Sequence, residues 1–357
     1  MSMTTYAGLS SAPNGVLARC VEFRTAINDQ HTLLSAAQTH RFQQEGFLVL
    51  PALSDEIEVN LIRSLLMALF DRQTGREEGN QFDMLSLDDG RHGALQPQLI
   101  KPGLYAPALL QTRYFLRVEA LARQLLGRET TLSFDHSILK PAGSLVATPW
   151  HQDEAHHEDA YFHHEQISFW MPLQDVSEHN GCMSYVPGSN LGPLLPHGSL
   201  NGDPCIHALE CSTEHFDVTA ALPQPVSAGS CILHSGRTLH SALPNRSNAD
   251  RLVYVLVFRG PLIPRRERVL YPWLQAKRTA SLLRGRRWRR HGGHLVLIAR
   301  RLRQLLRSDL RSLPVKLRKL LHLTRASWSS FDVTVAESTS SDTQSKPDEQ
   351  RPSHVKL

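Results

Sequence analysis

Residues 130–258 constrain the fold most, because short apolar runs alternate there with turn-forming residues. The runs cover residues 130–139, 167–173, 183–186, 231–233 and 252–258, and Gly, Pro, Asn and Asp stand between them. Several short strands separated by turns are typical of a β-sandwich or jelly roll. We therefore expect a mainly β core in this part of the chain.

Helical patterns precede the β-rich region. Apolar residues recur at helical spacing over 57–69, behind Ser54 as a suitable N-cap. A second apolar stripe over 107–126 stops at Gly127, a residue suited to the position after a helix. These patterns predict an α+β chain in which helices flank the β core.

Composition divides the chain into four parts. Residues 1–36 show little periodicity and are expected to form a loose lead-in, whereas residues 326–357 are rich in Ser, Thr, Asp, Glu and Lys, which predicts a disordered tail. The β core and its helices would occupy residues 37–264. Residues 265–325 would form a basic, helical C-terminal extension.

Charge separates the core from this extension. Residues 1–264 hold 17 Lys and Arg against 27 Asp and Glu, whereas residues 265–325 hold 19 against 2. Leu and Ile recur at helical spacing over 295–313 among arginines, which predicts an amphipathic cationic helix. Such a helix can contact an anionic membrane through residues 284–323, or it can pack on the acidic core; the pattern does not separate the two. Nucleic acid is a weaker expectation, because no recognised binding motif accompanies the charge.

Several classes of protein are not expected. No apolar run is long enough for a transmembrane helix, and residues 1–23 lack the basic and apolar regions of a signal peptide. The five cysteines are scattered without a CxxC pair, which argues against a zinc knuckle and a disulfide framework. We expect a cytoplasmic protein, either free or peripheral to the inner face of a membrane.

The sharpest local feature is the pair His151 and Asp153. In an extended segment, residues two apart point to the same side, so these two can present an imidazole and a carboxylate to one ion. A second histidine from a distant strand would complete the 2-His-1-carboxylate triad that suits non-haem Fe(II) oxygen chemistry. His234 and His240 are the two downstream candidates.

Further motifs make the sequence similar to a known family. The segment from Trp170 to Ser189 carries W-x-x-L-x-D, N-G-C and P-G-S in order, and His240 lies eleven residues before Arg251. In this order and spacing, the motifs resemble those of the phytanoyl-CoA dioxygenase family of Fe(II)/2-oxoglutarate oxygenases. The resemblance covers about residues 38–262.

The resemblance implies a double-stranded β-helix, the cupin-like jelly roll, with iron at one mouth. His151, Asp153 and His240 would bind Fe(II), and His234 would be a hydrogen-bonded neighbour. Arg251 would hold the distal carboxylate of 2-oxoglutarate, since a guanidinium pairs bidentately with a carboxylate. O2 would be the oxidant, and a substrate C–H would be hydroxylated with succinate and CO2 as co-products.

Other contacts to 2-oxoglutarate follow from the resemblance. His136 and Trp170 would line its pocket, and either Lys101 or Gln98 would add a polar contact. One position departs from the family pattern: Ala242 stands where relatives often carry a hydroxyl two residues after the distal histidine.

Other functions are compatible with parts of this pattern. A halogenase of the same fold would have a small residue in place of Asp153. A non-catalytic metal- or ligand-binding β-helix protein, tethered by its basic extension, is the main alternative. A cupin-type metalloenzyme without 2-oxoglutarate would leave the spacing of His240 and Arg251 unexplained. Four further histidines suggest either a second metal or substrate contacts: His156, His157, His163 and His164.

The sequence indicates only a broad class of substrate. Family members act on small molecules and acyl groups, and the basic extension favours an anionic, acyl- or lipid-type compound. The pattern carries no indication of the oligomeric state.

Overall fold

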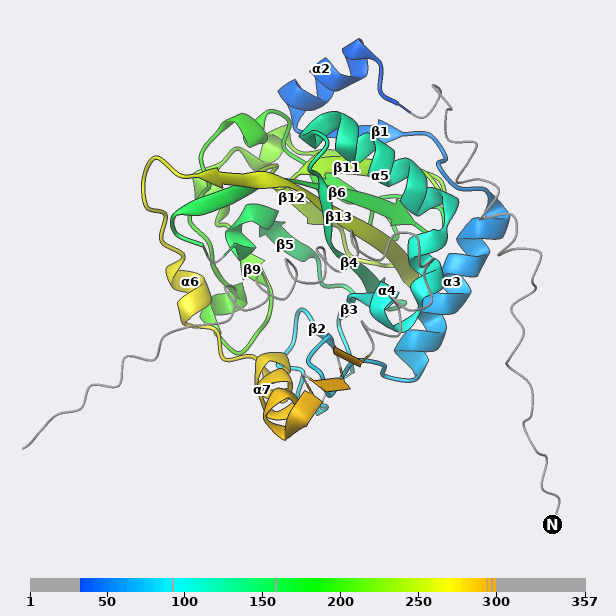
Figure 1. The fold of residues 1–357 in the computed structure, drawn as a ribbon, viewed down its shortest axis with the longest axis vertical. Helices are drawn as coiled ribbons and strands as arrows, with labels where there is room; N and C mark the ends of the chain where they lie inside the picture. The colour runs from blue at the N-terminus through cyan, green and yellow to red at the C-terminus, as the bar shows by residue number, and fades with distance from the viewer. Residues whose placement is uncertain (1–32, 92, 158, 294, 297, 300–357) are drawn as a thin grey trace, which may run out of the picture. The chain divides into compact units, whose positions relative to one another are not determined.

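The computed structural model describes residues 33–299, except residues 92, 158, 294 and 297. Helices and strands alternate up to residue 126, strands dominate from 131 to 264, and short helices follow (Figure 1). The expected disordered tail, most of the expected lead-in and most of the amphipathic helix lie outside the described residues.

Two antiparallel sheets form the core. The larger has seven strands in the order β1-β11-β6-β13-β4-β3-β2, and the smaller has four in the order β10-β7-β12-β5. The larger sheet consists of β1 (Phe47–Leu50), β11 (Cys231–Ser235), β6 (Phe162–Pro172), β13 (Arg251–Pro264), β4 (Thr131–Lys140), β3 (Pro97–Ile100) and β2 (Gln81–Asp83). The smaller consists of β10 (Leu222–Gln224), β7 (Met183–Tyr185), β12 (His240–Ala242) and β5 (Thr148–His151). Strands distant in sequence are neighbours in both sheets, as in a jelly roll, and the predicted fold class is confirmed.

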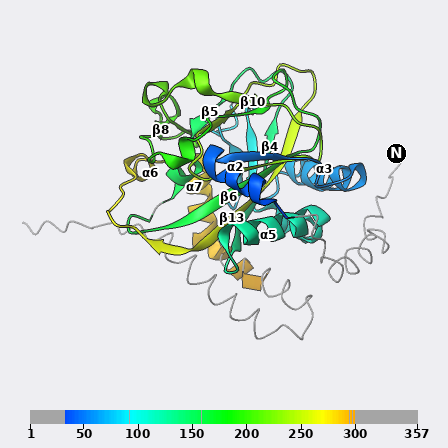
Figure 2. The ribbon, with the colours of Figure 1, turned by 90° about the horizontal axis from the view of Figure 1, so that it is seen from above.

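Side chains along β13 point alternately toward the covering helices and into the space between the two sheets. Leu252 and Leu256 pack toward the helices, whereas Val253 and Val255 pack between the two sheets. Both faces of this strand are apolar, because both are buried. Figure 2 shows α5 (Arg113–Leu126) on one side of β6 and β13, with β5 and β10 on the other.

Helices cover the outer face of the larger sheet. Helix α2 (Ala36–Glu45) leads into β1, and α3 (Glu56–Asp71) and α5 lie over the sheet. Ile62 of α3 and Val118 of α5 are fully buried in the resulting core.

The start of α3 differs from the prediction. Asp55, rather than Ser54, is the N-cap: its carboxylate accepts the Glu58 N–H and forms an ion pair with Arg113 of α5. A carboxylate can serve both partners, and its charge suits a helix N-terminus. The predicted end of α5 at Gly127 is confirmed, with a φ of 89°.

The first part of the basic extension packs against the core. After β13 come α6 (Pro272–Gln275) and α7 (Ala280–Trp288), and α7 contacts β2 (Figure 1). Arg284 of α7 forms an ion pair with Asp88 and donates to backbone carbonyls of the core. Helix α7 therefore packs on the core, whereas the stripe of leucine and arginine for which the sequence left two arrangements open lies mostly outside the described residues. None of the described helices is long and apolar enough to cross a membrane.

Candidate active site

His151 and His240 lie side by side on neighbouring strands of the smaller sheet. Their Cα atoms are partners in the ladder between β5 and β12, and their ring centroids are 4.2 Å apart. Asp153 begins the short helix η3 (Asp153–His156), directly after β5. One ligand atom from each of these three residues lies within 4.8 Å of the other two. The structure thus brings together the three residues that the sequence predicts as metal ligands.

Backbone hydrogen bonds orient both imidazoles. His151 Nδ1 lies 2.8 Å from the Pro149 carbonyl oxygen, and His240 Nδ1 lies 2.8 Å from the Thr238 carbonyl oxygen. A carbonyl can only accept, so each Nδ1 carries the proton and each Nε2 keeps a lone pair. This is the tautomer that a metal-binding histidine needs.

The two oxygens of Asp153 have different surroundings. Oδ1 lies 3.8 Å from His151 Nε2 and 3.7 Å from His240 Nε2. Oδ2 accepts a hydrogen bond from Ser168 Oγ at 2.7 Å and lies 3.4 Å from His234 Nε2. The protein therefore holds Oδ2 and leaves Oδ1 facing the two imidazoles.

His234 helps to hold the Asp153 carboxylate through Oδ2. Its Nδ1 lies 3.1 Å from the Tyr185 hydroxyl, while its Nε2 faces Asp153. The tautomer with a proton on Nε2 donates to the carboxylate and accepts the Tyr185 O–H. This placement agrees with the expectation of a hydrogen-bonded neighbour. The sequence does not predict the roles of Ser168 and Tyr185; Ser168 stands out only as a hydroxyl between the apolar residues Ile167 and Phe169.

Burial and neighbouring groups together set the protonation state of the three residues. It lowers the pKa of His151 and His240, and neighbouring imidazoles lower it further. Burial alone would raise the pKa of Asp153, but the hydrogen bond from His234 and the adjacent His240 hold it well below its usual range. Two neutral imidazoles and one carboxylate are the donor set of a 2-His-1-carboxylate iron site, so the residues fit Fe(II).

Arg251 lies between the two sheets at the start of β13. It is 2% exposed, and its guanidinium lies 5.8 Å from the centre of the Trp170 ring. Its Nε and Nη1 have no hydrogen-bond partner among the described residues. Burial lowers its pKa to about 10, so the side chain stays charged at neutral pH. A buried cation with unpaired donors is costly unless an anion completes it, and a carboxylate matches the guanidinium geometry.

Lys140 is a second buried basic residue beside Arg251. The two are register partners between β4 and β13. Lys140 Nζ donates to the carbonyl oxygens of Val146, Ala242 and Leu243 at 3.3, 3.4 and 2.9 Å. Burial and the adjacent Arg251 lower the Lys140 pKa to about 6. Because backbone carbonyls take up the donors of Lys140, Arg251 is the group left for a ligand anion.

Trp170 and His136 flank the same part of β13. Both are register partners of Val255, one on β6 and the other on β4. Gln98 Nε2 lies 3.2 Å from His136 Nδ1. Burial lowers the His136 pKa to about 4, so its ring is neutral and Nδ1 can accept from Gln98.

Lys101 has different surroundings. Its side chain is exposed, and it is the N-cap of α4 (Pro102–Tyr105), with a φ of 59°. Its charge acts on Asp135, whose carboxylate accepts the Tyr254 hydroxyl. Of the two alternatives for the further polar contact, Gln98 is therefore the one that contacts His136.

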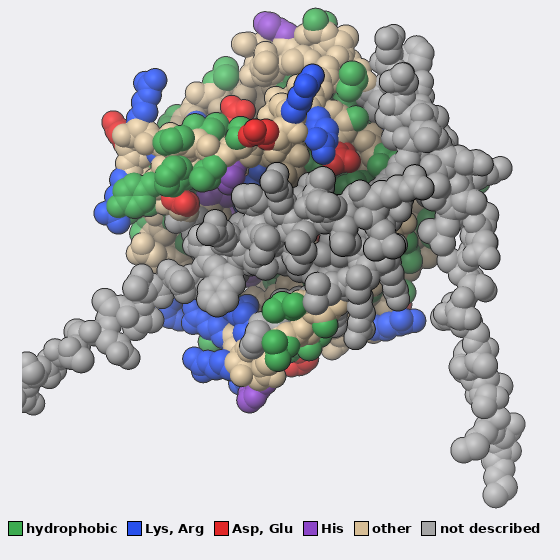
Figure 3. All heavy atoms as spheres, viewed as in Figure 1, with side chains coloured by type: hydrophobic (Ala, Val, Ile, Leu, Met, Phe, Trp, Pro, Cys, Tyr) green, Lys and Arg blue, Asp and Glu red, His purple; other side chains and the backbone are tan. Residues whose placement is uncertain are grey.

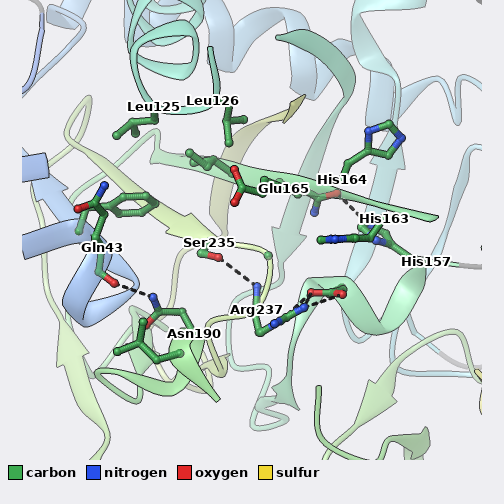
Figure 4. Close-up of a pocket in the computed structure, with 16 residues that line it drawn as sticks. Gln43, Leu125, Leu126, His157, His163, His164, Glu165, Asn190, Ser235 and Arg237 are labelled. Atoms are coloured by element: carbon green, nitrogen blue, oxygen red, sulfur yellow. Dashed lines mark hydrogen bonds and ion pairs between the residues drawn. The ribbon is translucent and has the colours of Figure 1, made fainter. Parts of the chain in front are cut away.

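The four additional histidines separate into two groups. The His156 ring lies 6.4 Å from that of His151. His157, His163 and His164 instead line a cavity of about 390 Å³ (Figure 4). Within the part of the chain that the structure describes, only His151, Asp153 and His240 form a group able to hold a metal ion.

Comparisons with known proteins point to one family. The model of the Phytanoyl-CoA dioxygenase (PhyH) family matches residues 42–253. The chain is 25% identical over 268 residues to phytanoyl-CoA dioxygenase domain-containing protein 1 of Bos taurus, covering 62% of this chain and 88% of that protein. It is 27% identical over 275 residues to ectoine dioxygenase of Halomonas elongata, covering 70% and 76%.

A solved structure agrees with these relatives. The crystal structure of EvdO2 from Micromonospora carbonacea var. aurantiaca, complexed with 2-oxoglutarate, has a TM-score of 0.57 and 30% sequence identity, covering 68% of this chain and 97% of that chain. The segment that matches the family model contains His151, Asp153, His240 and Arg251. The chain belongs to the phytanoyl-CoA dioxygenase family and is one of its Fe(II)/2-oxoglutarate-dependent oxygenases.

Proposed function

We propose that this oxygenase hydroxylates an unactivated C–H bond of a small-molecule or acyl-type substrate, with His151, Asp153 and His240 as iron ligands and Arg251 as the anchor of 2-oxoglutarate. The observation that carries the proposal is Arg251, whose Nε and Nη1 lack partners among the described residues. A buried guanidinium with unpaired donors requires an anion, and the distal carboxylate of 2-oxoglutarate would supply it.

Strand β6 contacts both Arg251, the proposed anchor of 2-oxoglutarate, and the metal ligand Asp153. Ser168 contacts Asp153, and two residues further on, Trp170 contacts Arg251. Residues two apart in a strand point to the same side, so both contacts lie on one face of β6. In this proposal 2-oxoglutarate lies along that face, with one end at the triad and the other at the guanidinium.

Each residue has a defined task in this proposal. When bound, Fe(II) and 2-oxoglutarate supply the activation of O2 for hydroxylation, with succinate and CO2 as co-products. Ser168 and His234 hold Asp153 so that Oδ1 stays directed at the imidazoles. Trp170 and its apolar neighbours exclude water from the space in front of Arg251. The C–H selectivity then depends on how the substrate is held in front of the triad.

The test is the visible charge-transfer band of an Fe(II)–2-oxoglutarate complex. Full-length apoprotein is mixed with Fe(II) and 2-oxoglutarate under anaerobic conditions, and Asp153→Ala, Arg251→Ala and the surface control Arg266→Gln are treated alike. We expect the band in the wild type and the control, its loss in Asp153→Ala, and its weakening in Arg251→Ala. Absence of the band from folded, metal-loaded wild type would favour the non-catalytic binding protein instead.

We also propose that the extension brings the enzyme to an anionic membrane at the cytoplasmic face and that the substrate is acyl- or lipid-type. Leu283, Leu295, Val296 and Ile298 are exposed, and Lys and Arg side chains gather over α7 (Figure 3). Exposed leucines beside arginines suit the boundary of an anionic lipid surface.

Co-sedimentation with vesicles tests this part separately. We expect the full-length protein to bind vesicles that contain phosphatidylserine but not pure phosphatidylcholine, and Leu283→Glu with Leu295→Glu to weaken that binding. If the wild type binds neither kind of vesicle, a small water-soluble substrate becomes the better proposal. One relative, ectoine dioxygenase, is named for a small-molecule substrate.

A further inference from the structure

Helix η3 carries Asp153 at its first position but is only four residues long. A single 3₁₀ turn has weak hydrogen-bond geometry of its own, so its surroundings determine where it lies. The next two residues, Glu154 and Ala155, are both buried. Whatever holds these two residues also holds the carboxylate of Asp153.

The Glu154 side chain joins η3 to two other segments. Arg237, from the turn between β11 and β12, pairs with it at 2.9 Å, and Arg265, which follows β13, pairs with it at 3.2 Å. The side chains of Arg265 and Glu154 are only 8% and 7% exposed. Figure 4 shows Arg237 and its ion pair in the wall of the histidine-lined cavity. Removing one partner from a buried ion pair is costly, so this contact constrains η3 strongly.

Arg265 is itself held in place. Its guanidinium donates to the Tyr271 hydroxyl at 2.7 Å and to the Phe162 carbonyl at 3.2 Å. Its backbone N–H donates to the Tyr161 carbonyl at 2.7 Å. The arginine is therefore a fixed point on the extension rather than a mobile surface charge.

Trp273 of α6 contacts the chain on both sides of Asp153. Its Nε1–H donates to the Ala155 carbonyl at 2.9 Å. Its ring lies 5.6 Å from that of His197, whose Nε2 accepts the N–H of Gln152 at 3.0 Å. Gln152 is the residue between the two predicted ligands.

We infer that Arg265 and Trp273 of the C-terminal extension are positioning residues for the iron centre, which act on Asp153 through η3. The inference rests on the proposal that Asp153 binds the metal. Both residues lie beyond residue 253, where the match to the family model ends. The beginning of the extension is in this view part of the active site and not only an attachment segment.

Metal binding by the full-length apoprotein tests the inference, with Co(II) as the spectroscopic probe. The variants are Arg265→Met and Trp273→Phe. The matched controls are Arg266→Gln, an exposed neighbour, and Trp288→Phe, a half-buried tryptophan of α7. Asp153→Ala is the reference for loss of a ligand, and thermal unfolding of each apoprotein shows whether it is folded.

We expect each positioning variant to raise the Kd for Co(II) about tenfold, the lower end of the range for residues that support metal ligands. The affinity of the metal-loaded variants for 2-oxoglutarate should stay within about twofold of the wild type, because Arg251 lies at the opposite end of the 14-residue strand β13 from Arg265 and shares no partner with the two residues among the described contacts. A general loss of structure would weaken both affinities, so the difference between them separates positioning from mere stability. Both controls should match the wild type.

Wild-type Co(II) affinity in the folded variants, alongside loss of binding in Asp153→Ala, would overturn this inference and leave the proposed ligands intact. Absence of Co(II) binding to the wild type would overturn both. Trp273→Phe keeps an aromatic ring but loses the N–H donor and part of the indole volume, and Trp288→Phe controls for the loss of volume. This variant therefore tests the inference even if Arg265→Met does not fold.

Discussion

His151 lies directly opposite His240 in the ladder between β5 and β12, and the register shifts between His240 and Ala242. A slip of one residue in either strand would turn an imidazole to the other face of the sheet. The metal site therefore depends on the pairing of two short strands that are far apart in the sequence. Asp153 needs no such pairing, because it follows His151 by two residues.

Arg251→Met should separate stability from co-substrate binding. Removing a buried, unpaired charge should stabilise the apoprotein by about 1 kcal/mol or more. Losing a bidentate, charge-assisted contact should raise the KM for 2-oxoglutarate at least about a hundredfold. Thermal unfolding of the apoprotein measures the first effect, and steady-state kinetics at varied 2-oxoglutarate concentration measures the second. A less stable apoprotein with unchanged KM would show that Arg251 is an ordinary structural residue.

Asp153→Asn should abolish tight metal binding while leaving the fold in place. Asparagine has nearly the same shape and still accepts from Ser168, but it lacks the charge that attracts a divalent ion. We expect the Kd for Co(II) to rise more than about a hundredfold, beyond the range for supporting residues. Titration followed by absorption measures it, and an unchanged Kd would exclude Asp153 as a ligand.

His234→Phe tests the support behind the triad. The substitution removes the group that lies 3.4 Å from Asp153 Oδ2 and leaves the Tyr185 hydroxyl without its imidazole. Supporting partners of metal ligands are worth about 10–100-fold in affinity or activity. His164→Phe is the matched control, since His164 is a histidine of β6 that donates to the Gly260 carbonyl. Equal Co(II) affinities in the two variants would contradict this role.

Buried histidines should make the apoprotein sensitive to acid. Burial lowers the pKa values of His136, His197 and His207 from the usual 6.5 to about 4. Between these values the unfolded chain binds more protons than the folded protein, so the free energy of unfolding should fall as the pH drops from 6.5 to 4. Above pH 6.5 these residues should have no effect. Urea unfolding across this range measures the profile, and His136→Gln should flatten it.

Gln98 and Lys101 can be distinguished by their effect on 2-oxoglutarate. Gln98→Leu removes the hydrogen bond to His136 and should raise the KM about two- to tenfold, as expected for one hydrogen bond. Lys101→Met should leave the KM unchanged, because its side chain is exposed and acts on Asp135. Steady-state kinetics of the two variants decides between them, and the opposite result would place Lys101 in the pocket.

Local patterns in the sequence sufficed for a mainly β core and for the pair His151 and Asp153, whereas the choice of His240 over His234 came from the family resemblance. Strand periodicity places Arg251 on the same face as Val253 and Val255, and the two-residue spacing places His151 and Asp153 on one side. The spacing between His240 and Arg251 came from the family resemblance. These features are readable because residues close in sequence have fixed relative directions within a strand.

Contacts between distant segments required the fold. Ser168, Tyr185 and Lys140 acquire their roles only through partners on other segments of the chain, and nothing in their own neighbourhood in the sequence indicates those partners. The contacts of the extension are likewise not readable from its sequence. Its alternation of leucine and arginine is equally suited to lipid and to an acidic protein surface. Strand register and packing placed Arg265 against Glu154, because the energy of a buried ion pair depends on which charges the chain brings together and not on their order along it.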